Sequence, residues 1–219
     1  GAQANTRATN TMFTARLMYE LLLAEFSFQD GDPQSGYRFM LDAARRTGDE
    51  ALFRRATDMA IQSRSGPGAL EVARAWREAH PDSVDANRYE LQVLLALNRV
   101  AETEAPLRAT LAALPKDDRE DFLAALPQLY SRASDKTEAA HVVEHALDNA
   151  LKDPAQAAAA WTAIGRLRLQ AGDKVGALAA ATLGQDADPA ARWPALLALQ
   201  LAAADEPQAE SLVQHYLQS

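Results

Sequence analysis

The sequence of 219 residues contains no cysteine, only 6% aromatic residues and no long apolar run. Without cysteine there is no disulfide, no thiolate metal site and no cysteine nucleophile. Because no stretch of about 18 apolar residues occurs, we expect no transmembrane segment in this chain. Acidic residues outnumber basic ones by 30 to 22, and this net charge of -8 argues against a nucleic-acid partner, which would require a basic surface.

Signals for β-strands are also scarce, and the chain is instead rich in helix formers. Roughly a fifth of the residues are alanine, the strongest helix former. Apolar residues recur at three- and four-residue steps, as in Phe53, Ala56 and Ala60, which is the period of an amphipathic helix. Short breaks such as Thr47-Gly48-Asp49 and Gly172-Asp173 supply helix-ending glycine and helix-capping aspartate. The sequence predicts an all-α protein of about twelve helices.

The helices recur as pairs, most clearly in the stretch that begins near residue 158. Trp161, Ile164-Gly165, Gly172-Asp173, Ala177 and Pro189 follow one another at a spacing that resembles the tetratricopeptide repeat, a helix–turn–helix unit of about 34 residues. In that family, small residues at the eighth and twentieth positions let the two helices of a unit approach closely. A non-repeating helical array is the alternative.

The resemblance implies a right-handed α-solenoid of about six such units, which start near residues 17, 50, 84, 120, 158 and 190. We therefore expect a single superhelical domain over residues 17–219. Residues 1–16 precede the first unit and are predicted to be a flexible segment.

Tetratricopeptide repeats bind proteins or peptides along a concave face that is lined by the first helix of each pair. The resemblance therefore implies a non-catalytic scaffold with a protein or peptide partner, without cofactor or bound metal. Carried onto this sequence, the residues of the repeat that commonly face the groove are Leu21, Glu25, Phe28, Arg54, Asp58, Gln62, Arg88, Gln92, Gln128, Arg132, Arg166 and Gln170.

A narrower resemblance lies in the N-terminal third. The segments 18–25, 43–49 and 54–60 look like the opening of proteobacterial tetratricopeptide-repeat lipoproteins. Those proteins sit on the periplasmic face of the outer membrane, and some are adaptors for a carboxyl-terminal processing protease. The resemblance implies an envelope adaptor that recruits the protease or its substrates, with a lipid anchor in the uncropped protein. A generic assembly scaffold without the protease link is the alternative.

Catalysis has one remote candidate, because His141-Val142-Val143-Glu144-His145 matches the His-x-x-Glu-His pattern of inverted zinc proteases. On a helix the two histidines lie at i and i+4, so both could reach one metal ion. The repeat frame, however, places them on the outer side of a second helix. The only later glutamates, Glu206 and Glu210, lie two repeats away. We therefore expect no enzyme, with a metal-dependent hydrolase as the remote alternative.

Two arginine pairs, Arg45-Arg46 and Arg54-Arg55, form either a local basic patch or surface ion pairs. If they form ion pairs, their expected partners are the nearby Asp49, Glu50 and Asp58. Each such exposed pair would contribute about 0–1 kcal/mol to the stability of the fold.

Overall fold

A computed structural model describes residues 1–203 and 207–219. These residues form α-helices and one 3-10 helix (η1), with no strand among them, so the all-α prediction is confirmed. The elements are α1 (Ala2–Gln29), α2 (Pro33–Thr47), α3 (Glu50–Gln62), α4 (Gly66–Ala79), α5 (Val84–Ala96), η1 (Val100–Thr103), α6 (Glu104–Ala113), α7 (Lys116–Leu129), α8 (Lys136–Ala146), α9 (Asp148–Leu151), α10 (Ala157–Gln170), α11 (Lys174–Ala187), α12 (Arg192–Ala203) and α13 (Gln208–Gln218).

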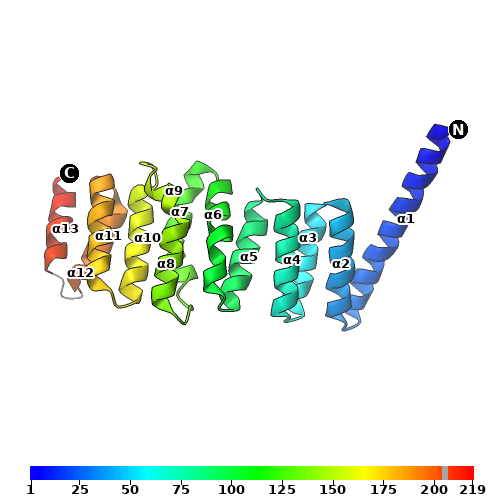
Figure 1. Cartoon of the computed structure of the whole chain (residues 1–219), viewed down its shortest axis with the longest axis horizontal. Coiled ribbons are helices and arrows are strands. Elements are labelled where there is room, and N and C mark those ends of the chain that lie inside the picture. The colour runs from blue at the N-terminus through cyan, green and yellow to red at the C-terminus, as the bar shows by residue number, and fades with distance from the viewer. Residues whose placement is uncertain (204–206) are drawn as a thin grey trace. The chain divides into compact units, whose positions relative to one another are not determined.

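The chain divides into two compact units, residues 1–93 and residues 94–219. Within each unit a helix packs against the next one in the chain, as α1, α2, α3 and α4 do in the first and α10, α11, α12 and α13 in the second (Figure 1). Contacts also skip one helix, since α2 meets α4, α10 meets α12, and α11 meets α13. This stacking of helix pairs is the packing of a helical solenoid. The expected single domain over residues 17–219 stays a prediction.

Side-chain caps set the helix boundaries. Asp49 accepts a hydrogen bond from the Ala51 backbone N–H at 2.9 Å and starts α3, while Gly48, at φ 69°, ends α2 in the left-handed conformation. Asp173 accepts from the Gly176 N–H at 2.8 Å and starts α11. An acceptor at this position satisfies a backbone donor that has no partner inside the helix. The predicted breaks at these two places are therefore confirmed, for the expected reason.

Close packing between helix pairs depends on Gly165 in α10. A Cβ atom at this position would fall inside van der Waals contact of the Leu197 side chain in α12. It would also lie 3.1 Å from the Cβ of Ala180 in α11. A small residue here allows three helices to meet, as the repeat resemblance predicts for its eighth position.

Helix α1 is longer than expected and begins at Ala2. Residues 2–16 are exposed and form its first half, which extends beyond α2 (Figure 1). Their predicted flexibility stays a prediction. In the part of the chain that the structure describes, no helix combines the length and the apolar character that crossing a membrane requires.

Candidate partner-binding surface

The first helix of each pair is called the A helix below. The A helices are α1, α3 and α5 in the first unit and α7, α10 and α12 in the second. Most of the groove residues predicted from the repeat lie on these helices. They are described for each unit separately.

In the first unit, the predicted groove residue Glu25 on α1 is bound to Arg55 on α3. Each carboxylate oxygen accepts a hydrogen bond from the guanidinium, from Nε and from Nη2, at 2.9 Å. The same guanidinium lies over the ring of Phe28, 5.2 Å from its centroid. The hydrogen bond from Arg55 lowers the pKa of Glu25, and partial burial opposes that shift only in part. A bidentate pair thus joins two neighbouring A helices.

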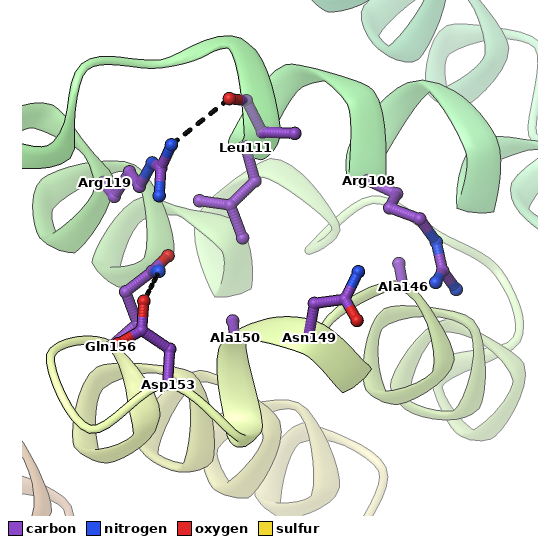
Figure 2. Close-up of a pocket in the computed structure, with 9 residues that line it drawn as sticks. Arg108, Leu111, Arg119, Ala146, Asn149, Ala150, Asp153 and Gln156 are labelled. Atoms are coloured by element: carbon purple, nitrogen blue, oxygen red, sulfur yellow. Dashed lines mark hydrogen bonds between the residues drawn. The ribbon is translucent and has the colours of Figure 1, made fainter.

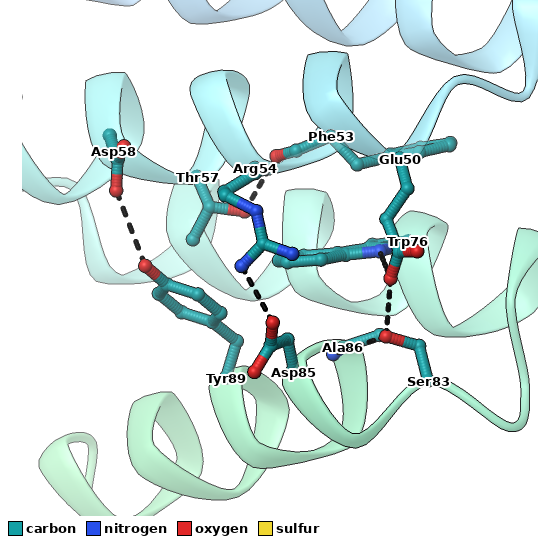
Figure 3. Close-up of polar contacts among 10 residues, drawn as sticks. All are labelled: Glu50, Phe53, Arg54, Thr57, Asp58, Trp76, Ser83, Asp85, Ala86 and Tyr89. Carbon is teal, nitrogen blue, oxygen red and sulfur yellow. Dashed lines mark hydrogen bonds and ion pairs between the residues drawn. The ribbon is translucent and has the colours of Figure 1, made fainter.

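Arg54 makes the next connection, from α3 to α5. Its Nη1 lies 2.7 Å from Oδ2 of Asp85, and its guanidinium stacks over Trp76 at 5.1 Å from the ring centroid (Figure 3). The hydrogen bond to Asp85 raises the pKa of Arg54. At the same tryptophan, Glu50 accepts hydrogen bonds from the Trp76 indole N–H at 3.1 Å and from the hydroxyl of Ser83.

Asp58 is the third groove residue with a partner on the adjacent A helix. The Tyr89 hydroxyl on α5 donates to its Oδ1 at 3.2 Å (Figure 3). Burial, followed by the nearby Asp58 charge, raises the pKa of Tyr89. Glu25 and Asp58 occupy equivalent positions one repeat length apart, and so do their donors Arg55 and Tyr89. The same inter-helix contact is therefore built twice with different donors.

These contacts correct the assignment of ion-pair partners to the arginine pairs. Arg54 and Arg55 pair with neighbouring A helices and not with the nearby acidic residues in their own segment. Arg46 pairs with Glu20 on α1 and with Asp42, while Arg45 lies 3.9 Å from Glu71 on α4. Ion pairing as such is confirmed, but apart from Arg46 with Asp42 inside α2 these pairs join different helices, and sequence proximity did not identify the partners.

The remaining predicted residues of the first unit have no polar contact of their side chains within the described residues. Gln62 and Gln92 are exposed, and Arg88 and Leu21 are half-buried. They lie on the same three A helices as the paired residues. The polar groups of Gln62, Gln92 and Arg88 therefore lie on the same helices as the side chains that the inter-helix contacts hold in place.

In the second unit, Gln128 is exposed on α7, and Gln170 at the end of α10 donates to the Pro127 carbonyl at 3.3 Å. Arg132 does not lie on an A helix, since α7 ends at Leu129 and this arginine falls in the following turn. The repeat frame fails here because Asp135, which caps α8 through the Glu138 N–H, leaves a longer connection after α7.

Arg166 on α10 belongs to a cluster that the groove prediction missed. Its guanidinium lies 5.8 Å from the ring centroid of Trp193, and that of Arg192 lies 4.5 Å from the same ring. The Trp193 indole N–H donates to the carboxylate of Glu120 on α7. Arg166 is half-buried, and this burial lowers its pKa. Trp193 lies near the start of the unit that begins near residue 190, but nothing in the sequence indicated two arginines over its ring.

Two residues of the histidine motif, His141 and Glu144, line a hollow of about 330 Å³ between α8, α10 and α11. His141 and His145 are exposed. Both oxygens of Glu144 accept from Arg168 Nη2 at 3.1 Å, which holds this carboxylate in an inter-helix contact. Over residues 1–203 and 207–219, no three histidine or acidic side chains are placed to hold a metal ion. Glu206 lies outside the described residues, and the hydrolase alternative gains no support.

A second hollow, of about 250 Å³, lies between α6, α7, α9 and the start of α10 (Figure 2). The two arginines that line it are both hydrogen-bonded to other groups of the protein. Arg119 donates to the carbonyls of Leu114 at 3.0 Å and Ala112 at 3.2 Å, and Arg108 pairs with Asp148 at 2.8 Å. The guanidinium groups of both arginines are accordingly already bound within the protein.

No family model and no curated protein matches the sequence. Among solved structures, the chain is similar to "PilW, widely conserved type IV pilus biogenesis factor", with 18% identity over 92% of this chain and 89% of that one, at a TM-score of 0.40. It is also similar to TTC0263, "a thermophilic TPR protein" of Thermus thermophilus, with 15% identity, 86% and 98% coverage, and a TM-score of 0.38. Likeness at this level transfers no property, so the tetratricopeptide resemblance rests on the residues and on the stacked helix pairs.

Proposed function

We propose that this protein is a non-catalytic scaffold that binds a protein or peptide along its A helices. The observation that carries this proposal is the repeated contact between A helices, Glu25 with Arg55 and Asp58 with Tyr89. A surface whose side chains are already ordered loses less conformational entropy when a partner binds. Arg88, which has no ion-pair partner among the described residues, lies on α5 beside this row and supplies donors for such a partner.

The finer form of the proposal is an envelope adaptor. The resemblance of segments 18–25, 43–49 and 54–60 to tetratricopeptide lipoproteins supports a place at the periplasmic face of the outer membrane. It also supports a lipid anchor and recruitment of a carboxyl-terminal processing protease or its substrates. An assembly scaffold without the protease remains the coarser form, and the acidic net charge of -8 favours protein over nucleic acid as the partner.

Affinity capture from a proteobacterial envelope extract tests both forms. The wild type is compared with Arg88→Glu, on α5, and with Arg38→Glu, a matched charge reversal at an exposed position of α2 outside the A helices. We expect the captured proteins, quantified by mass spectrometry, to be lost with Arg88→Glu and kept with Arg38→Glu. Equal capture by both variants refutes binding through α5. Capture without a carboxyl-terminal processing protease refutes the adaptor form alone.

A further inference from the structure

Arg166 is a predicted groove arginine that is half-buried at the contact with another repeat and has no acidic partner among the described residues. Other arginines at helix junctions have one: Arg54 pairs with Asp85 at 2.7 Å, and Arg168 pairs with Glu144 at 3.1 Å. The guanidinium of Arg166 lies over the ring of Trp193 and has no hydrogen bond or ion pair within the described residues, and its burial lowers its pKa. Removing a cation from water without an anion is unfavourable, so this position is stabilised when an anion reaches it.

A second cation lies at the same ring. Arg192 places its guanidinium 4.5 Å from the Trp193 centroid and has no ion pair within the described residues. The indole is held by its hydrogen bond to Glu120, whose carboxylate is not within ion-pair distance of either arginine. Two like charges over one ring repel each other, and an anion between or beside them removes that repulsion. A guanidinium that stacks on an aromatic ring still presents its edge N–H groups to a carboxylate.

An apolar side chain adjoins this charge. Leu196 lies one turn after Trp193 on α12 and is 43% exposed. An acidic residue bound at the arginines would thus place its neighbour in a peptide near an exposed leucine. The combination of a carboxylate and an adjacent apolar group matches a peptide better than it matches a free small anion.

We propose that Arg166, Arg192 and Trp193 form a recognition site for a carboxylate of a bound peptide, with an apolar residue next to it that packs on Leu196. This inference rests on the proposed function and specifies which chemical group of the partner the second unit binds. The carboxylate comes either from an aspartate or glutamate side chain or from a peptide C-terminus. Because the groups involved are partly exposed, binding weakens as ionic strength rises.

The test is selection from a random peptide library displayed in two formats, one with a free C-terminus and one with the C-terminus fused to the carrier. The proteins compared are the wild type, Arg166→Gln, Arg192→Gln and, as the matched control, Arg132→Gln in the turn after α7. We expect wild-type peptides enriched in aspartate or glutamate beside an apolar residue. Enrichment in both formats assigns a side-chain carboxylate, and enrichment confined to the free format assigns the C-terminus.

Synthetic peptides from the selection then give dissociation constants. We expect Arg166→Gln and Arg192→Gln each to weaken binding about tenfold, as for loss of a charge-assisted hydrogen bond, and Arg132→Gln to leave it unchanged. Thermal melts check that each variant is folded. Selected peptides without an acidic bias, or with an affinity that survives both variants, overturn the carboxylate site while the scaffold function stands. If no peptide is selected at all, the site is also refuted, and the scaffold function is judged by the capture experiment alone.

Discussion

Glu25 on α1 and Arg55 on α3 form a bidentate ion pair, with both hydrogen bonds at 2.9 Å, between the A helices of successive repeats. One repeat later, Asp58 and Tyr89 occupy the equivalent positions and form a single hydrogen bond. The chain thus uses the same two positions to fix the spacing of its A helices. That spacing determines which side chains a partner can contact at the same time.

A double-mutant cycle on Glu25→Gln and Arg55→Gln measures the strength of the first pair. Since both side chains are 36% exposed, solvent limits their coupling, and we expect about 0.5–1 kcal/mol at pH 7. The arginine lowers the folded-state pKa of Glu25, so the stabilisation is present above the unfolded value of about 4.3 and is lost as pH falls through the folded pKa. Urea unfolding at pH 7 and below pH 4 checks this, and a coupling that is the same at both pH values contradicts it.

Tyr130 gives a prediction at alkaline pH. Its ring is fully buried, and its hydroxyl donates to Thr103 Oγ1 at 2.7 Å. Burial raises the pKa of this phenol far above its ordinary value, so above about pH 10 it ionises only in the unfolded chain and stability falls. Tyr130→Phe is expected to cost about 1 kcal/mol at pH 7 and to reduce the loss of stability above pH 10. Tyr19→Phe, at an exposed hydroxyl, is the control, and denaturant melts from pH 7 to 11 decide the outcome.

Gly165→Val tests the close approach of α10, α11 and α12. The added side chain meets Leu197 and the Cβ of Ala180, so overpacking is expected to cost about 1–3 kcal/mol. Ala179→Val, at an exposed position of α11, is the matched control and carries only the helix-propensity cost of about 0.7 kcal/mol or less. Equal losses in the two variants, measured by denaturant unfolding, would show that the contact at Gly165 is not tight.

The variant Arg166→Met tests whether Arg166 contributes to the stability of the protein or only to the proposed binding of a peptide. Because the guanidinium is half-buried without an anionic partner in the described part of the chain, its replacement by an apolar side chain of similar length is expected to leave the melting temperature unchanged or higher. Arg55→Met is the comparison, because it leaves Glu25 without its partner and is expected to lower the melting temperature. A clear loss of stability with Arg166→Met would indicate a structural role for the cation.

The helical fold was predictable because its determinants are local. Gly48 and Asp49 mark a boundary through their own backbone conformation and capping chemistry, and both act in the structure as expected. Gly165 was also recognisable, since its small size is part of the repeat pattern.

The pairing of surface side chains was not predictable, because the partners lie about one repeat or more apart in the sequence. Nothing near Arg54 in the sequence indicates Asp85, and nothing near Trp193 indicates Glu120. The repeat frame placed Arg132 on a helix because a periodic pattern does not indicate that α7 ends earlier, at Leu129, and is followed by a longer turn. Positions within one helix are set by a fixed period, whereas pairing between helices depends on which of several equivalent partners lies within reach.

Site-specific photo-crosslinking tests the central claim, binding along the A helices, most directly. A photoreactive residue replaces Gln92 on α5 or Gln128 on α7, both exposed A-helix positions, and Gln34 on α2 serves as the exposed control. After irradiation with the captured partner, we predict crosslinks from Gln92 and Gln128 and none above background from Gln34. Crosslinks confined to Gln34, or of equal yield at all three positions, would contradict the account.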